Sequence, residues 1–163
     1  MKIAWIDQAQ SALKEQQEKQ KQEQRIFHGL VIPDELAGIT PTMDLDMVRL
    51  ELHQRYGMSS VFLTQKEGKY LVVSSGNKRE LSPLEAAWVE RQVKDCLDNE
   101  SQETWQSMVG GDYMSVKICT TDTVLVDLFH KVPFKKYYEL KHQLQTLATY
   151  GSLSESEKKK VSP

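Results

Sequence analysis

A helix-start signal placed directly after two apolar runs is the feature that most constrains this chain. In Ser82-Pro83-Leu84-Glu85 the serine can cap free N–H groups, the proline suits the first helical position, and the glutamate can bond back to the cap. The preceding runs, residues 61–63 and 70–73, are β-branched, aromatic or large apolar residues, which favour strands. The polar stretch 65–69 between them contains Gly68 and predicts a turn. The sequence therefore predicts a β-hairpin that leads into a helix.

The same order of elements recurs later in the chain. Residues 114–118 alternate between apolar and polar, which indicates a half-buried strand, and residues 124–128 supply the next apolar set. Pro133 can open a final helix that ends at Gly151. We therefore expect an α+β fold, with an antiparallel sheet of four or five strands built from two β-hairpins, each followed by an amphipathic helix. The expected shared core consists of Val61, Leu63, Val72, Val89, Val93, Val116, Val126, Leu140 and Leu144.

The stretch between residues 26 and 57 has less regular punctuation. Glycines and prolines at 29, 33, 38 and 41 predict a loop with one strand at 27–32. After it, Thr42 or Asp44 can cap a helix that reaches Tyr56, with Gly57 as its C-terminal cap. The spacing of its apolar face predicts a helix over residues 44–56, and that face consists of Leu45, Val48, Leu52 and Tyr56.

The two ends of the chain differ from its middle. Residues 14–25, KEQQEKQKQEQR, favour a helix but contain no apolar residue, and no sustained heptad supports a coiled coil. This segment is either a solvated arm or a helix that a partner completes. The last residues are poor in apolar side chains. We expect an extended polar N-terminal helical arm at 1–26, an α+β core domain at 27–151 and a flexible C-terminal tail at 152–163.

Composition narrows the partners and the compartment. The formal net charge of −2 over 163 residues provides no general field that would attract nucleic acid or an acidic membrane surface. Cys96 and Cys119 are placed as small buried hydrophobes, which favours a reducing compartment and predicts a cytoplasmic protein. The apolar patch at 3–6 is too short for a signal peptide, and no run has membrane-spanning length.

Residues that could support chemistry do not form a recognisable site. The four histidines, at 28, 53, 130 and 142, lack the spacing of metal motifs, and a pairing of Cys96 with His130 or His142 has no local signature. Asp34 with Glu67 and Lys69 mimics a nuclease metal pattern, but the last two lie at a hairpin tip. Gly110-Gly111 predicts a turn. We expect no catalytic residue, no metal and no cofactor.

The remaining features favour a non-enzymatic protein-interaction module, an adaptor that binds a partner polypeptide at a sheet edge or an apolar groove. Large amphipathic side chains often anchor such contacts. The candidate partner-binding residues are Ile3, Trp5, Ile6, Leu13 and Tyr138. Their partner is another protein or a second copy of this chain. The order helix, hairpin, helix, hairpin, helix resembles that of type III secretion chaperones, and this similarity implies dimerisation and the holding of an extended partner segment.

The alternative is a nucleic-acid-binding accessory or regulatory protein. A helix at 44–56 followed by a hairpin with a basic tip is similar to part of a winged helix, with the hairpin as the wing. Acidic residues Asp44, Asp46 and Glu51 on the same helix oppose phosphate contact. The candidate nucleic-acid-binding residues are Arg49, Arg55, Lys66, Lys69, Lys78 and Arg79.

Overall fold

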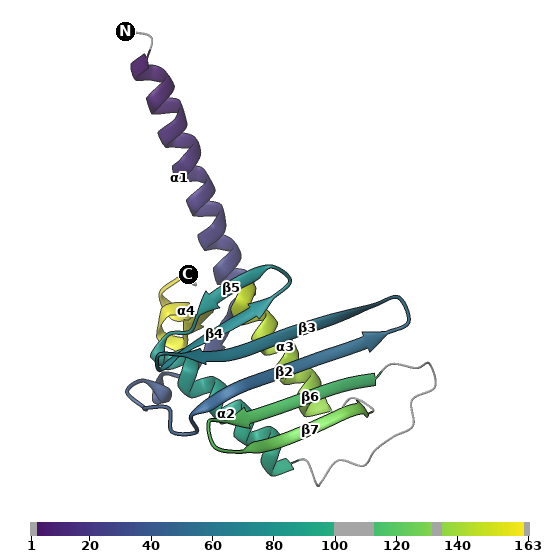
Figure 1. Cartoon of the computed structure of the whole chain (residues 1–163). Coiled ribbons are helices and arrows are strands. Elements are labelled where there is room, and N and C mark those ends of the chain that lie inside the picture. Colours follow the sequence, from purple (N-terminus) through teal and green to yellow (C-terminus); the bar gives the residue numbers. More distant parts are fainter. Residues whose placement is uncertain (1–2, 100–112, 132–134, 162–163) are drawn as a thin grey trace.

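The computed structural model describes residues 3–99, 113–131 and 135–161, with side chains described over 8–20, 29–99, 113–128 and 135–158. The fold is α+β, with a six-stranded antiparallel sheet, a two-stranded parallel pair and an N-terminal helix that projects from the core (Figure 1). The elements are α1 (Ile3–His28), β1 (Leu30–Ile32), the 3-10 turn η1 (Asp34–Leu36), β2 (Leu45–Gln54), β3 (Gly57–Lys66), β4 (Lys69–Ser74), β5 (Asn77–Glu80), α2 (Pro83–Asn99), β6 (Tyr113–Thr120), β7 (Val124–Lys131), α3 (Lys135–Thr149), β8 (Ser152–Ser154) and α4 (Glu155–Val161).

The large sheet has the strand order β5-β4-β3-β2-β6-β7. Strands β2 to β5 follow one another as a meander, and the β6–β7 hairpin joins the free side of β2. The two predicted hairpins are present as β3–β4 and β6–β7, and β2 joins them in one sheet, which has six strands where four or five were expected. The prediction that a strand pair precedes each of the helices α2 and α3 is confirmed.

The helix predicted over residues 44–56 is wrong, since this stretch forms β2 and the turn into β3. Its burial follows a period of two: Val48, Leu50 and Leu52 are buried, while the residues between them are only half-buried. The helical stripe assumed for the prediction left out Leu50 and ended on Tyr56, which is 90% exposed. Gly57 begins a strand and caps no helix.

Strand β5 is a further element that the sequence did not signal. Its residues, Asn77-Lys78-Arg79-Glu80, include no apolar side chain that would suggest a strand. The turn that precedes it places Ser75 and Gly76 at φ values of 47° and 80°, the left-handed region that two-residue hairpin turns require. The expected break after β4 is therefore a tight turn into a fourth meander strand.

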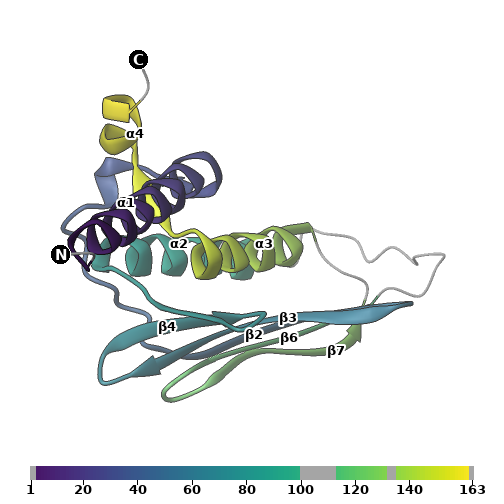
Figure 2. The same ribbon diagram turned by 90° about the horizontal axis from the view of Figure 1, so that it is seen from above.

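The start of α2 confirms the predicted capping box. The backbone N–H of Ser82 donates to Glu85 Oε1 at 2.9 Å, and the backbone N–H of Glu85 donates to Ser82 Oγ at 3.2 Å. Helices α2 and α3 lie side by side over one face of the sheet (Figure 2). All nine residues of the predicted core are buried between these layers, as is Cys96, whereas the buried Cys119 lies opposite Met47 of β2 and outside this core.

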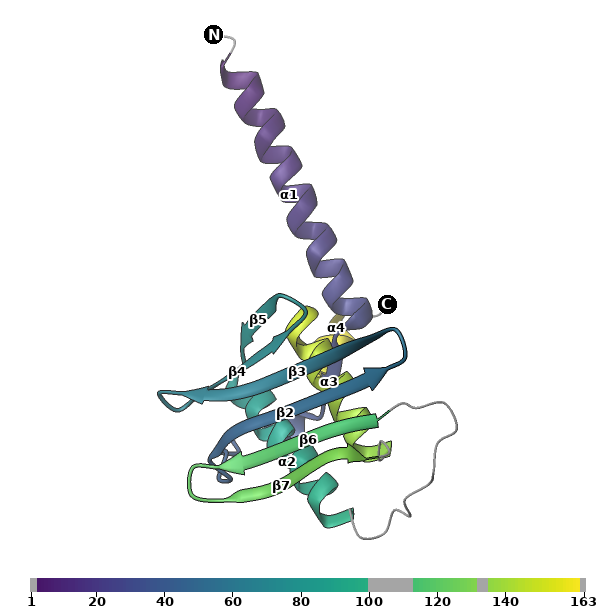
Figure 3. The ribbon, with the colours of Figure 1, turned by 45° about the vertical axis from the view of Figure 1, so that its right-hand side comes forward.

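Two segments far apart in sequence, residues 30–36 and 152–156, meet beside the helices. Strand β1 pairs in parallel with β8, and Asp34 accepts hydrogen bonds from the backbone N–H and the hydroxyl of Ser156 at 3.1 Å each. Strand β8 and helix α4 occupy residues 152–161 of the predicted tail, whose flexibility stays a prediction. Helix α1 extends away from this point, and its residues 8–20 are all exposed (Figure 3).

Candidate interaction surface

One face of the large sheet carries no helix within the described residues (Figure 2), and we call it the uncovered face. Because side chains alternate along a strand, it receives every second residue of β2, β3, β4 and β6. Phe62 lies opposite Val73 on β4 and opposite Arg49 on β2. The apolar patch of this face consists of Met47, Phe62, Leu71 and Val73, all half-buried. Such a patch can still lose exposed area to a partner.

A polar row of Arg49, Glu51, His53 and Ser115 runs beside the apolar patch. The Glu51 carboxylate lies between its neighbours, with Oε1 3.6 Å from Arg49 Nε and Oε2 3.4 Å from His53 Nε2. Ser115 lies directly opposite Glu51 in the register of β2 and β6. The His53 ring stacks on Tyr113, with a centroid distance of 4.4 Å. The row thus gathers charged and polar groups on the neighbouring strands β2 and β6.

Three atoms of the polar row are buried without a hydrogen-bond partner: Arg49 Nε, His53 Nε2 and Ser115 Oγ. Buried polar atoms in folded proteins are nearly always hydrogen-bonded, so unpaired ones need an explanation. The uncovered face thus gathers three of the buried polar atoms that lack a hydrogen bond within the described part of the chain.

On the covered face, Glu85 is the centre of a satisfied network. It is 1% exposed, and its Oε2 accepts hydrogen bonds from Arg79 Nη1 at 2.6 Å and from Ser152 Oγ at 2.8 Å. Burial alone would raise the pKa of Glu85, but the bonds from Arg79, Ser82 and Ser152 outweigh burial and hold that pKa below its usual value. This network joins β5, α2 and β8, and the ion pair between Arg79 and Glu85 at its centre has a structural role.

A second buried carboxylate, Glu90, holds the loop that enters β2. Its Oε1 accepts from the backbone N–H groups of Thr42 and Met43 at 2.8 and 2.9 Å, and its Oε2 accepts from the Tyr70 hydroxyl at 2.8 Å. The Tyr70 hydroxyl in turn accepts from the backbone N–H of Leu45 at 3.0 Å. Burial and the bond to Glu90 raise the pKa of Tyr70, which keeps the phenol neutral.

A hollow of about 700 Å³ lies beside these two networks, lined by residues that include Lys69, Tyr70, Arg79 and Glu80. Four of its charged side chains form two pairs: Lys69 Nζ lies 3.4 Å from Glu80 Oε1, and Arg79 is bound to Glu85. The remaining carboxylate, Asp44, accepts hydrogen bonds from Gln65 and Thr121. Since no charge in these pairs is left for a ligand to neutralise, the hollow gives a weaker indication of a site than the uncovered face does.

The structure does not bring the predicted partner-binding residues together. Leu13 is 56% exposed on α1, and Ile3, Trp5 and Ile6 belong to the same helix, where their side chains fall outside the description. Tyr138 is 48% exposed on α3, on the helix side of the sheet. The arm and Tyr138 are therefore separate candidates. Neither includes the uncovered face, which the sequence analysis missed because it assigned β2 to a helix.

The residues of the nucleic-acid alternative are brought together only in part. Arg49 and Lys78 share one cross-strand row of the uncovered face, because Arg49 pairs with Phe62, Phe62 with Val73 and Val73 with Lys78. The Arg79 guanidinium is instead bound to Glu85 on the covered face. Arg55 lies in the turn before β3 and its guanidinium covers the Tyr56 ring, while Lys66 ends β3 and Lys69 begins β4. The winged-helix geometry is lost together with the helix at 44–56.

No group of three or more histidine, cysteine, aspartate or glutamate side chains is placed to hold a metal ion in the described part of the chain. His28 and His130, like Gly110 and Gly111, fall where side chains are not described. Among the described residues, no helix is both long and apolar enough to span a bilayer.

Comparisons with known proteins add no relative. No protein-family model matches the chain, and neither the curated proteins nor the solved structures contain a match.

Proposed function

We propose that this protein is a non-enzymatic interaction module that binds a partner polypeptide through the uncovered face of its sheet. One observation carries the proposal: within the described residues, helices close one face of the sheet only, and the other face combines an apolar patch with a row of incompletely bonded polar groups. Contact by a partner would bury Phe62 and its neighbours and offer hydrogen-bond acceptors to the partly exposed Arg49 guanidinium.

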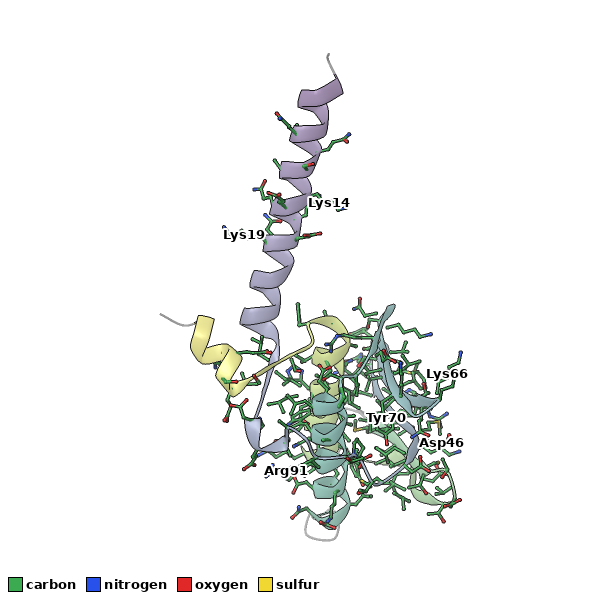
Figure 4. The ribbon with its side chains drawn as sticks, turned by 90° about the vertical axis from the view of Figure 1, so that its left-hand side faces the viewer. Lys14, Lys19, Asp46, Lys66, Tyr70 and Arg91 are labelled. Atoms are coloured by element: carbon green, nitrogen blue, oxygen red, sulfur yellow. The ribbon has the colours of Figure 1, made fainter. Side chains whose placement is uncertain are left out.

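Helix α1 supports the same function as a second docking element. Residues 8–20 are exposed, with Lys14 and Lys19 pointing away from the helix (Figure 4). An isolated helix of this length is marginal in water, so an exposed arm gains stability when its apolar residues are covered. Its apolar residues Ile3, Trp5, Ile6 and Leu13 gather in the N-terminal half.

The geometry of the polar row favours binding over catalysis. The Glu51 carboxylate lies 3.6 Å from Arg49 Nε and 3.4 Å from His53 Nε2, and these side chains lie on an open sheet face. Catalytic groups gain strength in enclosed sites that exclude water, which a bare sheet face does not provide. Adaptor and secretion-chaperone-like roles in the cytoplasm both fit this proposal.

Affinity purification from the native cell tests the proposal. We expect a polypeptide to be retained with little dependence on salt, and Phe62→Glu, which places a charge in the apolar patch, to abolish the retention. Ile39→Asp is the matched control, because Ile39 is 49% exposed in a loop outside both surfaces. Retention of DNA or RNA that falls steeply with salt would instead favour the nucleic-acid alternative.

Trp5→Ala tests the arm separately. If the arm docks on a partner, association weakens by about 2 kcal/mol or more, the range of an interface hot spot, while the thermal stability of the fold is retained. Loss of thermal stability with association unchanged would show that Trp5 packs on its own core and would exclude the arm as a docking element.

A further inference from the structure

We infer that a second copy of this chain occupies the uncovered face, and that residues 3–13 of α1 dock there in a reciprocal exchange of arms. This inference rests on the proposed function, because it names the occupant of the surface proposed above. It combines two incomplete surfaces of one molecule, the exposed arm and the bare sheet face, into a single contact.

The arm cannot cover the uncovered face of its own chain. Figures 1 and 2 show α1 on the helix side of the sheet, running across the strand direction and past the β5 edge. The helix is continuous over 26 residues, a length of about 39 Å at 1.5 Å per residue. Its apolar N-terminal residues therefore lie far from the core, and Leu13, on the approach to them, is 56% exposed.

The polarity of the arm fits docking by its N-terminal segment alone. If two arms paired along their length, residues 14–25 would need an apolar seam, and this stretch has none. If only residues 3–13 dock, residues 14–25 act as a spacer that crosses solvent, and a helix that is polar on all sides suits that role. The uneven distribution of apolar residues along α1 thus favours a sheet face over a second arm as the docking surface.

The dimensions and chemistry of the two surfaces match. A helical segment of eleven residues is about 16 Å long, and neighbouring strands are about 4.8 Å apart, so it can cross β4, β3 and β2. These strands carry the apolar patch of Met47, Phe62, Leu71 and Val73. The same segment of the arm includes Asp7, Gln8 and Gln10, whose side-chain oxygens can accept hydrogen bonds from the guanidinium of Arg49, a side chain that is 38% exposed.

Twofold symmetry makes the exchange reciprocal. The arm and the uncovered face lie on opposite sides of the sheet, and the arm extends beyond one sheet edge (Figures 1 and 2). Rotation about an axis parallel to the strands places each arm against the uncovered face of the other chain. Both contacts are then identical, as a closed isologous dimer requires.

The mass in solution tests the inference. We expect the full chain at micromolar concentration to sediment at twice the 18.8 kDa of one chain. Leu13→Asp on the arm and Phe62→Glu on the face should each raise the dimer dissociation constant by about 30-fold or more, the effect of losing a hot spot. Ile39→Asp should leave it unchanged. Thermal melts of all three variants verify that the fold is retained.

Mixing the two weakened variants separates arm exchange from other dimers. Homodimers of either variant have no intact contact, whereas the mixed pair has one, between the intact arm and the intact face. We therefore expect mixed species to form at concentrations where each variant alone is monomeric. A Phe62→Glu variant that dimerises like the wild type would point to pairing between arms and overturn the inference. A Leu13→Asp variant that dimerises like the wild type would point to pairing between two uncovered faces and would also overturn the inference.

A photo-crosslinking residue at position 13 provides a direct readout. We expect it to join peptides of β3 or β4 of a second chain, and crosslinks between two arms would contradict the exchange. A wild-type chain that stays monomeric at all concentrations but captures another polypeptide through Phe62 would overturn this inference and leave the proposed function standing. A dimer formed by arm exchange that captures no other polypeptide would support this inference and overturn the proposed binding of a separate partner polypeptide.

Discussion

The two faces of the large sheet differ in how completely the chain satisfies them. Under α2 and α3, apolar residues are closely packed, and the buried carboxylates Glu85 and Glu90 each accept several hydrogen bonds. On the uncovered face, apolar side chains remain half-buried, and Arg49 Nε and Ser115 Oγ have no hydrogen-bond partner among the described residues. The difference indicates that the covered face stabilises the fold and that the uncovered face is available for binding. Substitutions on the two faces should therefore have different consequences.

The largest effect is expected from Leu144→Ala under the sheet. Leu144 is fully buried, so its truncation leaves a cavity and should lower the free energy of unfolding by about 3–4 kcal/mol. Leu71→Ala is the matched substitution on the half-buried apolar patch and should cost about 1 kcal/mol. Urea denaturation of both variants measures the contrast, and equal losses would mean that the two faces contribute alike to the core.

Glu85→Gln is expected to follow, with a loss of about 2–3 kcal/mol at neutral pH, because it leaves Arg79 without its buried countercharge. Glu80→Gln breaks the exposed pair with Lys69 and should cost under about 0.5 kcal/mol. The pKa of Glu85 is lowered in the folded state, so its contribution is full above the ordinary pKa of 4.5 and is lost as the pH falls through and below that value. Denaturation from pH 7 to pH 3 should show the wild type and Glu85→Gln converging, and a constant gap would contradict this assignment.

Lys141→Met should be a smaller change, in the opposite direction. Lys141 is 5% exposed on α3, and its Nζ donates to Ser59 Oγ at 2.7 Å. Burial lowers the pKa of Lys141, because the charged form loses solvation. An apolar side chain of similar length removes this cost, so we expect a gain of about 1 kcal/mol at pH 7, measured by thermal melting. The gain should shrink toward pH 10, since the folded lysine releases its proton before the unfolded one. A destabilised Lys141→Met would show that the bond to Ser59 outweighs the cost of burying the charge.

The smallest effect is expected at Ser115 on the uncovered face. Ser115→Ala removes a hydroxyl without a hydrogen-bond partner and should change stability by under about 0.5 kcal/mol. Ser152→Ala on the covered side removes the bond to Glu85 and should cost about 1 kcal/mol. Chemical denaturation of the two serine variants compares the two sites, because both substitutions change the side-chain volume by the same small amount. A large loss at Ser115 would show that its hydroxyl is bonded within the single chain.

Local signals in the sequence predicted the covered side of the molecule well. The capping box at Ser82 and Glu85 fixed the start of α2, and strand and helix periodicity identified the buried residues correctly. The error at β2 arose because Leu45, Val48 and Leu52 fit a helical spacing by coincidence, while Leu50 revealed the alternation. The alternation of apolar residues with charged or polar ones along residues 48–53 was the sequence signal that could have corrected the helix prediction.

The candidate surface could not be read from local patterns. Arg49 meets Phe62 on β3 and Lys117 on β6 only through strand register, which joins residues far apart in sequence. Sequence also gave no sign of β5, whose four residues are all polar, or of the pairing of β8 with β1. These pairings depend on tertiary contacts that override local propensity. The arm was visible in the sequence because a run without apolar residues needs no tertiary context.

Amide hydrogen exchange of the full chain, measured at rising protein concentration, tests most directly whether the arm docks on the uncovered face of a second copy. An exposed arm should exchange rapidly when the chain is dilute, because residues 8–20 have no covering contacts. We expect the amide protection of residues 3–13 and that of β3 both to rise as the protein concentration rises. We expect Phe62→Glu to abolish both increases. Protection of the arm that is independent of concentration, or that rises equally in Phe62→Glu, would contradict this docking.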